Sequence, residues 1–244
     1  TYDDYVDVLG KASLPMISVI GNHDVDQRTL FDSKLGIPYF EAYLAPENYS
    51  FNIGKMHFVV VNSIDYRRAS DKAHYKEGME EHTIKWLEND LKFVPKESTI
   101  VLCSHAPLFK ERKNYNEENV NYDKYTALLA QYNKVYAWSG HTHQNYHFNY
   151  ALASDKKYES LKNIEVITVA RCQGMIRLNR ELNVDGTPNG YMVAEVNGDS
   201  MQWYYKSVGQ ERDHQIRIYS PVRTNSQYLK AIIWNHSESW GTPE

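Results

Sequence analysis

The positions of hydrophobic and polar residues predict short buried strands that alternate with amphipathic helices up to about residue 135. Runs that suit strands covered on both faces occur at 16–20, 57–61, 99–103 and 134–138. Helical spacing of apolar residues, or helix-forming composition between turn residues, occurs at 2–10, 28–46, 79–93 and 125–132. This alternation predicts an α/β layered fold.

The second half of the chain becomes mostly β after about residue 145. Turn residues separate the strand-like runs between 184 and 207, which predicts a hairpin or meander rather than another helix-linked strand. We expect the first domain to span residues 1–208, and residues 209–244 to start a β-rich accessory domain.

The composition and charge of the chain exclude several classes of protein. Its 244 residues carry a formal net charge of −4, so no basic patch is expected for binding nucleic acid. No apolar run reaches the length of a membrane span. Cys103 and Cys172 are too few for a disulfide scaffold or a cysteine-rich zinc site. The 20 tyrosines favour an exported protein, in the periplasm or at the cell surface.

Polar clusters follow three of the apolar runs, at the points where the predicted strands end. They consist of Asn22, His23 and Asp24, then His105, and finally His141 and His143. In open α/β sheets, ligands bind just beyond the carboxyl ends of the strands. We therefore expect the three clusters to meet at one edge of the sheet, although they are far apart in sequence.

The chemistry of these side chains favours a metal site. Imidazole nitrogen and amide oxygen, without thiolate, suit Zn, Mn, Fe or Ni. His141 and His143 stand two residues apart on a turn opened by Gly140, and they can bind one ion together or two ions side by side. Each cluster alone has a plainer explanation, as a turn or a structural histidine. Their joint placement favours metal binding.

The other histidines receive plainer interpretations. His57 is expected to pack within a hairpin, His82 to be solvated on its helix, and His74 to lie in a surface loop. His147 closely follows the third cluster and is a candidate for orienting a ligand. Asn62, which follows the run 57–61, can do the same or simply cap its strand.

Two loops and one further strand end lie where a substrate pocket is expected. The segments 63–78 and 110–124 are polar and long, and such loops are commonly functional. Residues 171–173, Arg-Cys-Gln, follow the run VITVA at a place equivalent to the three clusters.

The motifs GNHD at 21–24, SHAP at 104–107 and GHTH at 140–143 resemble, in that order, the motifs of the calcineurin-like metallophosphoesterases. The resemblance covers about residues 1–180. The tail is similar to the C-terminal accessory region of a bacterial branch of that family. The resemblance implies a metallophosphoesterase-like β-sandwich core flanked by helices.

The resemblance also implies a metal centre. Asn22, His105 and His141 resemble three ligands of one ion, and His143 resembles a ligand of a second ion. The two divalent ions would be Mn, Fe, Zn, Ni or Mg. Two such ions stabilise the attacking and leaving oxygens of a phosphoryl displacement.

The remaining two residues of the first cluster resemble catalytic ones. His23 resembles the residue that contacts the phosphoryl oxygens and protonates the leaving group, and Asp24 resembles the group that holds its imidazole. The implied reaction is hydrolysis of a phosphate ester, as a monoester, a diester or a pyrophosphate, by a metal-bound hydroxide.

The sequence departs from the family at its start. The family begins with strands that carry Asp-x-His and Gly-Asp, and residues 1–20 contain neither motif. We therefore expect a truncated chain that lacks the N-terminal strands, binds at most one ion well and has weak or no activity. A missing strand would leave a sheet edge exposed, which predicts self-association. The end of the chain also resembles an interrupted accessory domain.

Two alternatives to an enzyme remain open at the level of the sequence. One is a non-catalytic module on a phosphoesterase-like scaffold, which binds a ligand or a glycan through its β-rich tail. The other is a structural domain in which a single ion supports stability without hydrolysis.

Overall fold

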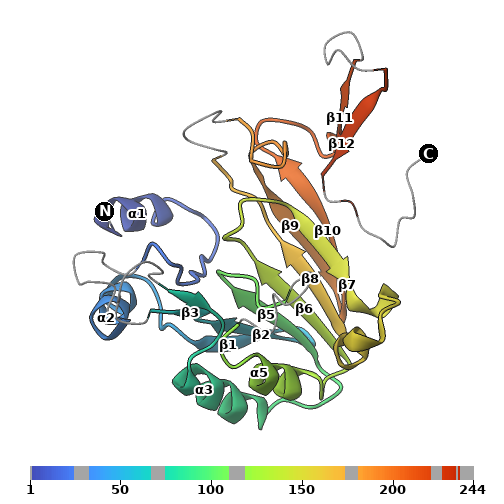
Figure 1. The fold of residues 1–244 in the computed structure, drawn as a ribbon. Coiled ribbons are helices and arrows are strands. Elements are labelled where there is room, and N and C mark those ends of the chain that lie inside the picture. The colour runs from blue at the N-terminus through green and yellow to red at the C-terminus, as the bar shows by residue number, and fades with distance from the viewer. Residues whose placement is uncertain are drawn as a thin grey trace.

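The computed structural model in Figure 1 describes residues 2–24, 33–66, 75–109, 119–173, 181–220, 227–234 and 236. Its centre is a six-stranded sheet in which four parallel strands lie between two antiparallel edge strands. In spatial order the strands are β1 (Tyr49–Ile53), β2 (Met56–Val61), β5 (Thr99–Ser104), β6 (Lys134–Ser139), β8 (Ile164–Thr168) and β7 (Tyr146–Asn149).

Two helices cover one face of this sheet. They are α3 (Glu81–Leu91) and α5 (Tyr122–Leu129), which lie together below the strands in Figure 1. Leu87 of α3 and Leu129 of α5 are fully buried against sheet residues such as Leu102. The helical spacing of apolar residues in the sequence therefore marks the side of each helix that packs on the sheet.

A β-hairpin covers the opposite face. Its strands are β9 (Gly190–Asn197) and β10 (Ser200–Ser207). The ring of Trp203 lies 5.8 Å from the ring of Tyr136 and 5.9 Å from that of Trp138, both edge-on. The parallel strands are thus buried on both sides, which explains their nearly continuous apolar character.

The remaining described elements flank these layers. They are α1 (Tyr2–Leu9), α2 (Ser33–Tyr43), β3 (Ile64–Asp65), β4 (Lys76–Glu77), the 3-10 turns η2 (Tyr150–Leu152) and η3 (Lys156–Leu161), β11 (Ile216–Tyr219) and β12 (Lys230–Ile233). None of the helices in the described ranges is long and apolar enough to cross a membrane.

The structure confirms the mixed α/β fold class and most of the predicted elements, but the predicted strand at 16–20 is wrong. That segment forms no strand, and Met16 and Ile17 are 55% and 50% exposed. A strand forms only where its backbone groups pair with a neighbouring strand, and residues 16–20 pair with none, although β1 is an edge of the sheet. The segment contacts the sheet through Tyr49, whose hydroxyl donates to the Ser18 carbonyl (2.6 Å).

The predicted loop 110–124 extends too far, because α5 begins at Tyr122. Residues 110–118 and His74 lie outside the described part of the chain. The domain boundary at 209 and the exported location stay predictions. Self-association also stays a prediction, and β1 and β7 are the two edges of the sheet at which it would occur.

Two histidines have clear structural partners. His57 is buried and lies 2.8 Å from both Asn52 Oδ1 in the hairpin and Asp90 Oδ2 on α3, which confirms its packing role. His147 Nε2 lies 2.8 Å from Glu165 Oε1, and its ring is edge-on to Trp203. The contacts of His147 therefore lie under the β9–β10 hairpin, so the suggestion that it orients a ligand is not supported.

His82 lies exposed on α3, as predicted, but it also has two acidic partners. Its Nε2 lies 2.8 Å from Glu47 Oε1 and its Nδ1 lies 3.5 Å from Glu80 Oε2. Glu47 in turn accepts from Asn62 Nδ2 (3.0 Å), and Asn62 Oδ1 accepts from the Ile64 amide (3.0 Å), so Asn62 caps the end of β2. The hydrogen bond to Glu47, followed by that to Glu80, raises the pKa of His82 to about 10.

We predict that His82→Gln lowers stability in a pH-dependent way. Because the pKa of His82 is higher in the folded state than its usual 6.5, its contribution is complete below pH 6.5 and disappears as the pH rises through about 10. The loss should be at most about 1 kcal/mol, since a half-exposed pair is screened by solvent. Urea unfolding at pH 6 and at pH 9.5 measures it, with Lys92→Gln at the C-terminal end of the same helix as control. A loss that stays constant over this range would contradict the assignment.

Candidate metal centre

Three side chains from distant parts of the sequence converge at the carboxyl edge of the central sheet. His105 follows β5 and His141 follows β6, and these two strands are parallel neighbours. His105 Nε2 lies 2.8 Å from Asn22 Oδ1 and 3.1 Å from His141 Nδ1. The predicted meeting of the three motifs is therefore present in the structure.

The loop after β6 separates the two histidines of the GHTH motif. The Gly140 amide donates to the His105 carbonyl (3.0 Å), which ties this loop to the end of β5. His141 and His143 have φ angles of 66° and 59°, in the left-handed region that non-glycine residues seldom adopt. His141 turns toward His105, whereas Nδ1 of His143 receives a hydrogen bond from an Arg171 guanidinium nitrogen (2.8 Å).

The residue before Asn22 must be small. A Cβ atom on Gly21 would lie 2.7 Å from His105 Nδ1 and 2.8 Å from its Cγ, closer than van der Waals contact allows. The backbone of Asn22 is also held, because the Tyr66 hydroxyl donates to its carbonyl. The GNHD loop therefore packs directly on the His105 ring, and the glycine is what permits the contact.

Two of the histidines at this edge, His105 and His143, have a lowered pKa. Burial, followed by repulsion from His141 and His23, lowers the pKa of His105 to about 4. Burial, followed by the charge of Arg171, also lowers the pKa of His143. Neutral imidazole is the form that binds a metal ion, because a lone pair must be available on nitrogen.

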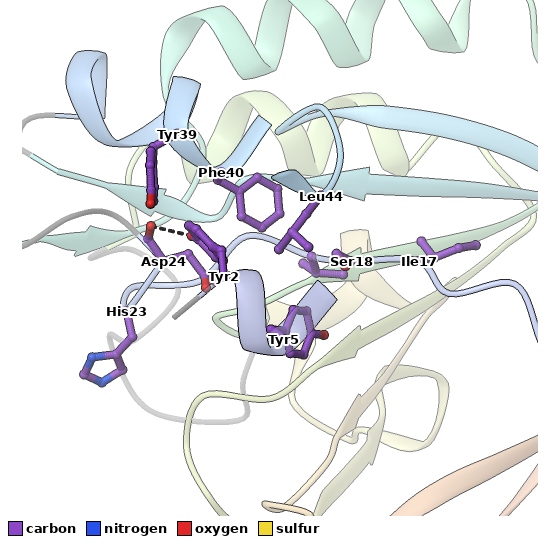
Figure 2. Close-up of a pocket in the computed structure, with 10 residues that line it drawn as sticks. Tyr2, Tyr5, Ile17, Ser18, His23, Asp24, Tyr39, Phe40 and Leu44 are labelled. Carbon is purple, nitrogen blue, oxygen red and sulfur yellow. Dashed lines mark hydrogen bonds between the residues drawn. The ribbon is translucent and has the colours of Figure 1, made fainter. Parts of the chain in front are cut away.

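His23 and Asp24 do not form the pair that the resemblance implied. Asp24 Oδ2 accepts from the Gly21 amide (2.7 Å), and its carbonyl accepts from the Tyr2 hydroxyl (2.7 Å). Burial raises the pKa of Asp24, and the Gly21 hydrogen bond partly offsets this. Figure 2 shows the imidazole of His23 extending away from the Asp24 side chain. Asp24 thus stabilises the turn of the GNHD loop.

A cavity of about 530 Å³ opens beside these two residues. Figure 2 shows aromatic side chains from α1 and α2 around it. Its lining comprises Tyr2, Tyr5, Ile17, Ser18, Val19, His23, Asp24, Tyr39, Phe40 and Leu44. The cavity offers an environment rich in aromatic side chains for an organic group next to His23.

Tyr75, Glu77 and Arg171 contact the site, although the sequence assigned none of them a role. His141 Nε2 lies 3.3 Å from Glu77 Oε1 and 3.3 Å from the Tyr75 hydroxyl, and both residues belong to the segment 63–78. That segment was expected to shape the pocket, but β4 has only two residues and Tyr75 lies before it, so no periodicity singles out either residue. Arg171 stood at a noted strand end, without a partner that the sequence could reveal.

Three of the four predicted metal ligands, Asn22, His105 and His141, are placed so that they can bind one divalent ion together. The described ranges contain no group of three or more His, Cys, Asp or Glu side chains arranged to hold a metal ion. Asn22, His105 and His141 nevertheless converge as one amide oxygen and two imidazoles, a chemistry that suits Mn, Fe, Zn or Ni. His143 does not join this set, since it contacts Arg171 instead.

We predict that Gly21→Ala displaces His105 and lowers affinity for Mn²⁺ at least tenfold. The added methyl group cannot fit against the imidazole, and forced overpacking also costs about 1–3 kcal/mol of stability. Calorimetric titration with Mn²⁺ and thermal unfolding measure the two effects. Gly140→Ala is the matched control, because its Cβ would meet nothing closer than 3.9 Å. Equal behaviour of the two variants would contradict the packing argument.

Comparison with known proteins places the chain in a family. The sequence profile of the calcineurin-like phosphoesterases matches residues 2–145, and that of the C-terminal region of calcineurin-like phosphoesterases matches residues 178–242. No curated protein matches the chain. A solved structure similar to it is a dimetal phosphatase from Danio rerio, with 16% identity, a TM-score of 0.43 and coverage of 69% of this chain. The chain spans only 66% of the length of that structure. On the profile match over more than half of its residues, the chain belongs to the calcineurin-like phosphoesterase family.

Proposed function

We propose that the protein is a metal-dependent hydrolase of phosphate esters. The observation that carries this proposal is the convergence of Asn22, His105 and His141, whose positions in the sequence span more than a hundred residues. Membership of the calcineurin-like phosphoesterase family supports the same reaction class. The substrate is a monoester, a diester or a pyrophosphate.

In this proposal, Asn22, His105 and His141 hold one divalent cation, which is Mn, Fe, Zn, Ni or Mg. Such a cation, when bound, polarises a phosphoryl oxygen and allows water to act as a nucleophile at neutral pH. The low pKa of His105 keeps its imidazole unprotonated, and Glu77 is within 3.3 Å of the other nitrogen of His141. A carboxylate in that place fixes the orientation of a ligating imidazole.

His23 is the proposed proton donor to the leaving group. It lies on the wall of the 530 Å³ cavity, whose tyrosines and Phe40 offer space for the organic part of the ester. Asp24 acts on His23 indirectly, because its carboxylate accepts from the Gly21 amide and so stabilises the turn that carries His23. The proposal therefore assigns Asp24 a positioning role within the GNHD loop.

A second cation would depend on His143, the remaining histidine of the GHTH motif. In the structure this imidazole is bonded to Arg171 and lies apart from the converging set. We therefore propose that the chain binds one ion well and hydrolyses esters slowly, since a single ion lacks the paired stabilisation of attacking and leaving oxygens.

We predict Mn²⁺-dependent hydrolysis of p-nitrophenyl phosphate that falls to background in His105→Ala and in His141→Ala. Loss of one ligand from a three-residue set should weaken Mn²⁺ binding at least tenfold, in line with losses seen at metal sites. His236→Ala, at an exposed position, is the control and should retain both properties. Hydrolysis is measured as p-nitrophenol released during prolonged incubation, and Mn²⁺ affinity is measured by calorimetric titration.

Wild-type protein that neither binds Mn²⁺ nor hydrolyses the ester would contradict the proposal and favour a non-catalytic module that binds a ligand or glycan. Protein that binds Mn²⁺, gains thermal stability from it and shows no hydrolysis would instead favour a structural one-metal domain.

A further inference from the structure

Arg171 occupies the carboxyl edge of the sheet beside the GHTH loop. It follows β8, the parallel neighbour of β6. Asn183, which is buried, holds its backbone on both sides: Asn183 Oδ1 accepts from the Arg171 amide (3.1 Å), and Asn183 Nδ2 donates to the Arg171 carbonyl (3.2 Å). The guanidinium is thereby directed at His143, whose Nδ1 is 2.8 Å from Arg171 Nη2.

The region around Asn183 also braces the GHTH loop. Asp185 Oδ2 accepts from the Asn145 amide (2.8 Å), and Asn145 Oδ1 accepts from the Ala170 amide (2.9 Å). These hydrogen bonds fix Asn145, which follows the GHTH motif, relative to Ala170, which precedes Arg171. Arg171 is presented to the site by a rigid backbone, which is how substrate-binding side chains are positioned.

The charge of Arg171 lacks an acidic counterpart in the described part of the chain. No carboxylate pairs with its half-buried guanidinium there, and its one side-chain partner is the imidazole of His143. A guanidinium stays charged and has five donors. A partly buried cation without an acid is costly to keep, and such a group at a candidate phosphoester site is suited to receiving an anion.

The bond between Arg171 and His143 is incompatible with a metal ion on His143. Because arginine can only donate, His143 Nδ1 must accept and carries no proton. The proton of the neutral ring is then on Nε2, so neither nitrogen has a free lone pair. A metal ion on Nδ1 would take the lone pair that Arg171 uses. A metal ion on Nε2 would move the proton to Nδ1, where it would face an Arg171 donor.

We propose that Arg171 is a substrate-binding residue that selects phosphate monoesters over diesters. When a phosphate ester binds beside the ion held by Asn22, His105 and His141, the guanidinium leaves the imidazole of His143 and donates to non-bridging oxygens of the phosphoryl group. A monoester carries between about 1.5 and 2 negative charges at neutral pH, whereas a diester carries one and has one acceptor oxygen fewer. The paired donors of arginine match the monoester better. This inference rests on the function proposed above.

The test separates this role from a structural one by the direction of two binding changes. In Arg171→Gln, calorimetry should show Mn²⁺ binding that is unchanged or several-fold tighter, because a competing cation beside His143 is gone. Binding of inorganic phosphate to the Mn²⁺-loaded protein should weaken at least tenfold. Arg171→Lys should restore part of the phosphate affinity. Arg212→Gln is the control, since Arg212 is exposed and paired with Glu195 on the hairpin.

Steady-state kinetics provide the second readout. For Arg171→Gln, kcat/KM for p-nitrophenyl phosphate should fall at least tenfold more than that for bis(p-nitrophenyl) phosphate. Equal losses on both esters, or loss of Mn²⁺ binding together with phosphate binding, would overturn the assignment and leave Arg171 with a structural role in the loop.

If wild-type protein binds Mn²⁺ and the variant matches it in every measurement, only the inference about Arg171 fails. If wild-type protein binds neither Mn²⁺ nor phosphate and hydrolyses neither ester, the proposed function fails and takes this inference with it.

Discussion

The parallel pairing of β5 with β6 is the constraint on which the site depends. The register places Cys103 beside Trp138 at the ends of the two strands, so the next residues of both strands emerge side by side. The amide of Gly140 extends this pairing by donating to the His105 carbonyl. Helices on one face and the β9–β10 hairpin on the other bury the strands and keep that register fixed. His105 and His141 are neighbours because of this backbone arrangement.

Imidazole and amide donors, together with the nearby guanidinium of Arg171, give the site its electrostatic character. His105 is held unprotonated by burial and by the other histidines, and Asn22 contributes an uncharged oxygen. Glu77 is the carboxylate that contacts the cluster, through His141, and Arg171 adds a positive charge at His143. A site of this composition is suited to an ion together with its anionic substrate, because imidazole and amide donors leave most of the charge of the ion to be balanced by the phosphate.

The sequence predicts those parts of the fold well in which a local run of apolar residues marks a strand of the sheet. The runs 57–61, 99–103 and 134–138 are strands, and the residues after the last two converge as expected. The run 16–20 has the same pattern but pairs with no strand of the sheet, which the pattern cannot reveal. The left-handed backbone of the GHTH loop separates His141 from His143, and no periodicity anticipates it. The partners of His82 and His141 come from distant segments, so their contacts depend on the tertiary fold.

The most direct test of the central claim is anomalous X-ray diffraction from crystals of the protein grown with Mn²⁺. We expect one strong anomalous peak within bonding distance of Asn22 Oδ1 and of ring nitrogens of His105 and His141, with the direct contact between the two imidazoles replaced by contacts to the ion. A map with no peak at this edge, and with the His105–His141 contact unchanged, would contradict it.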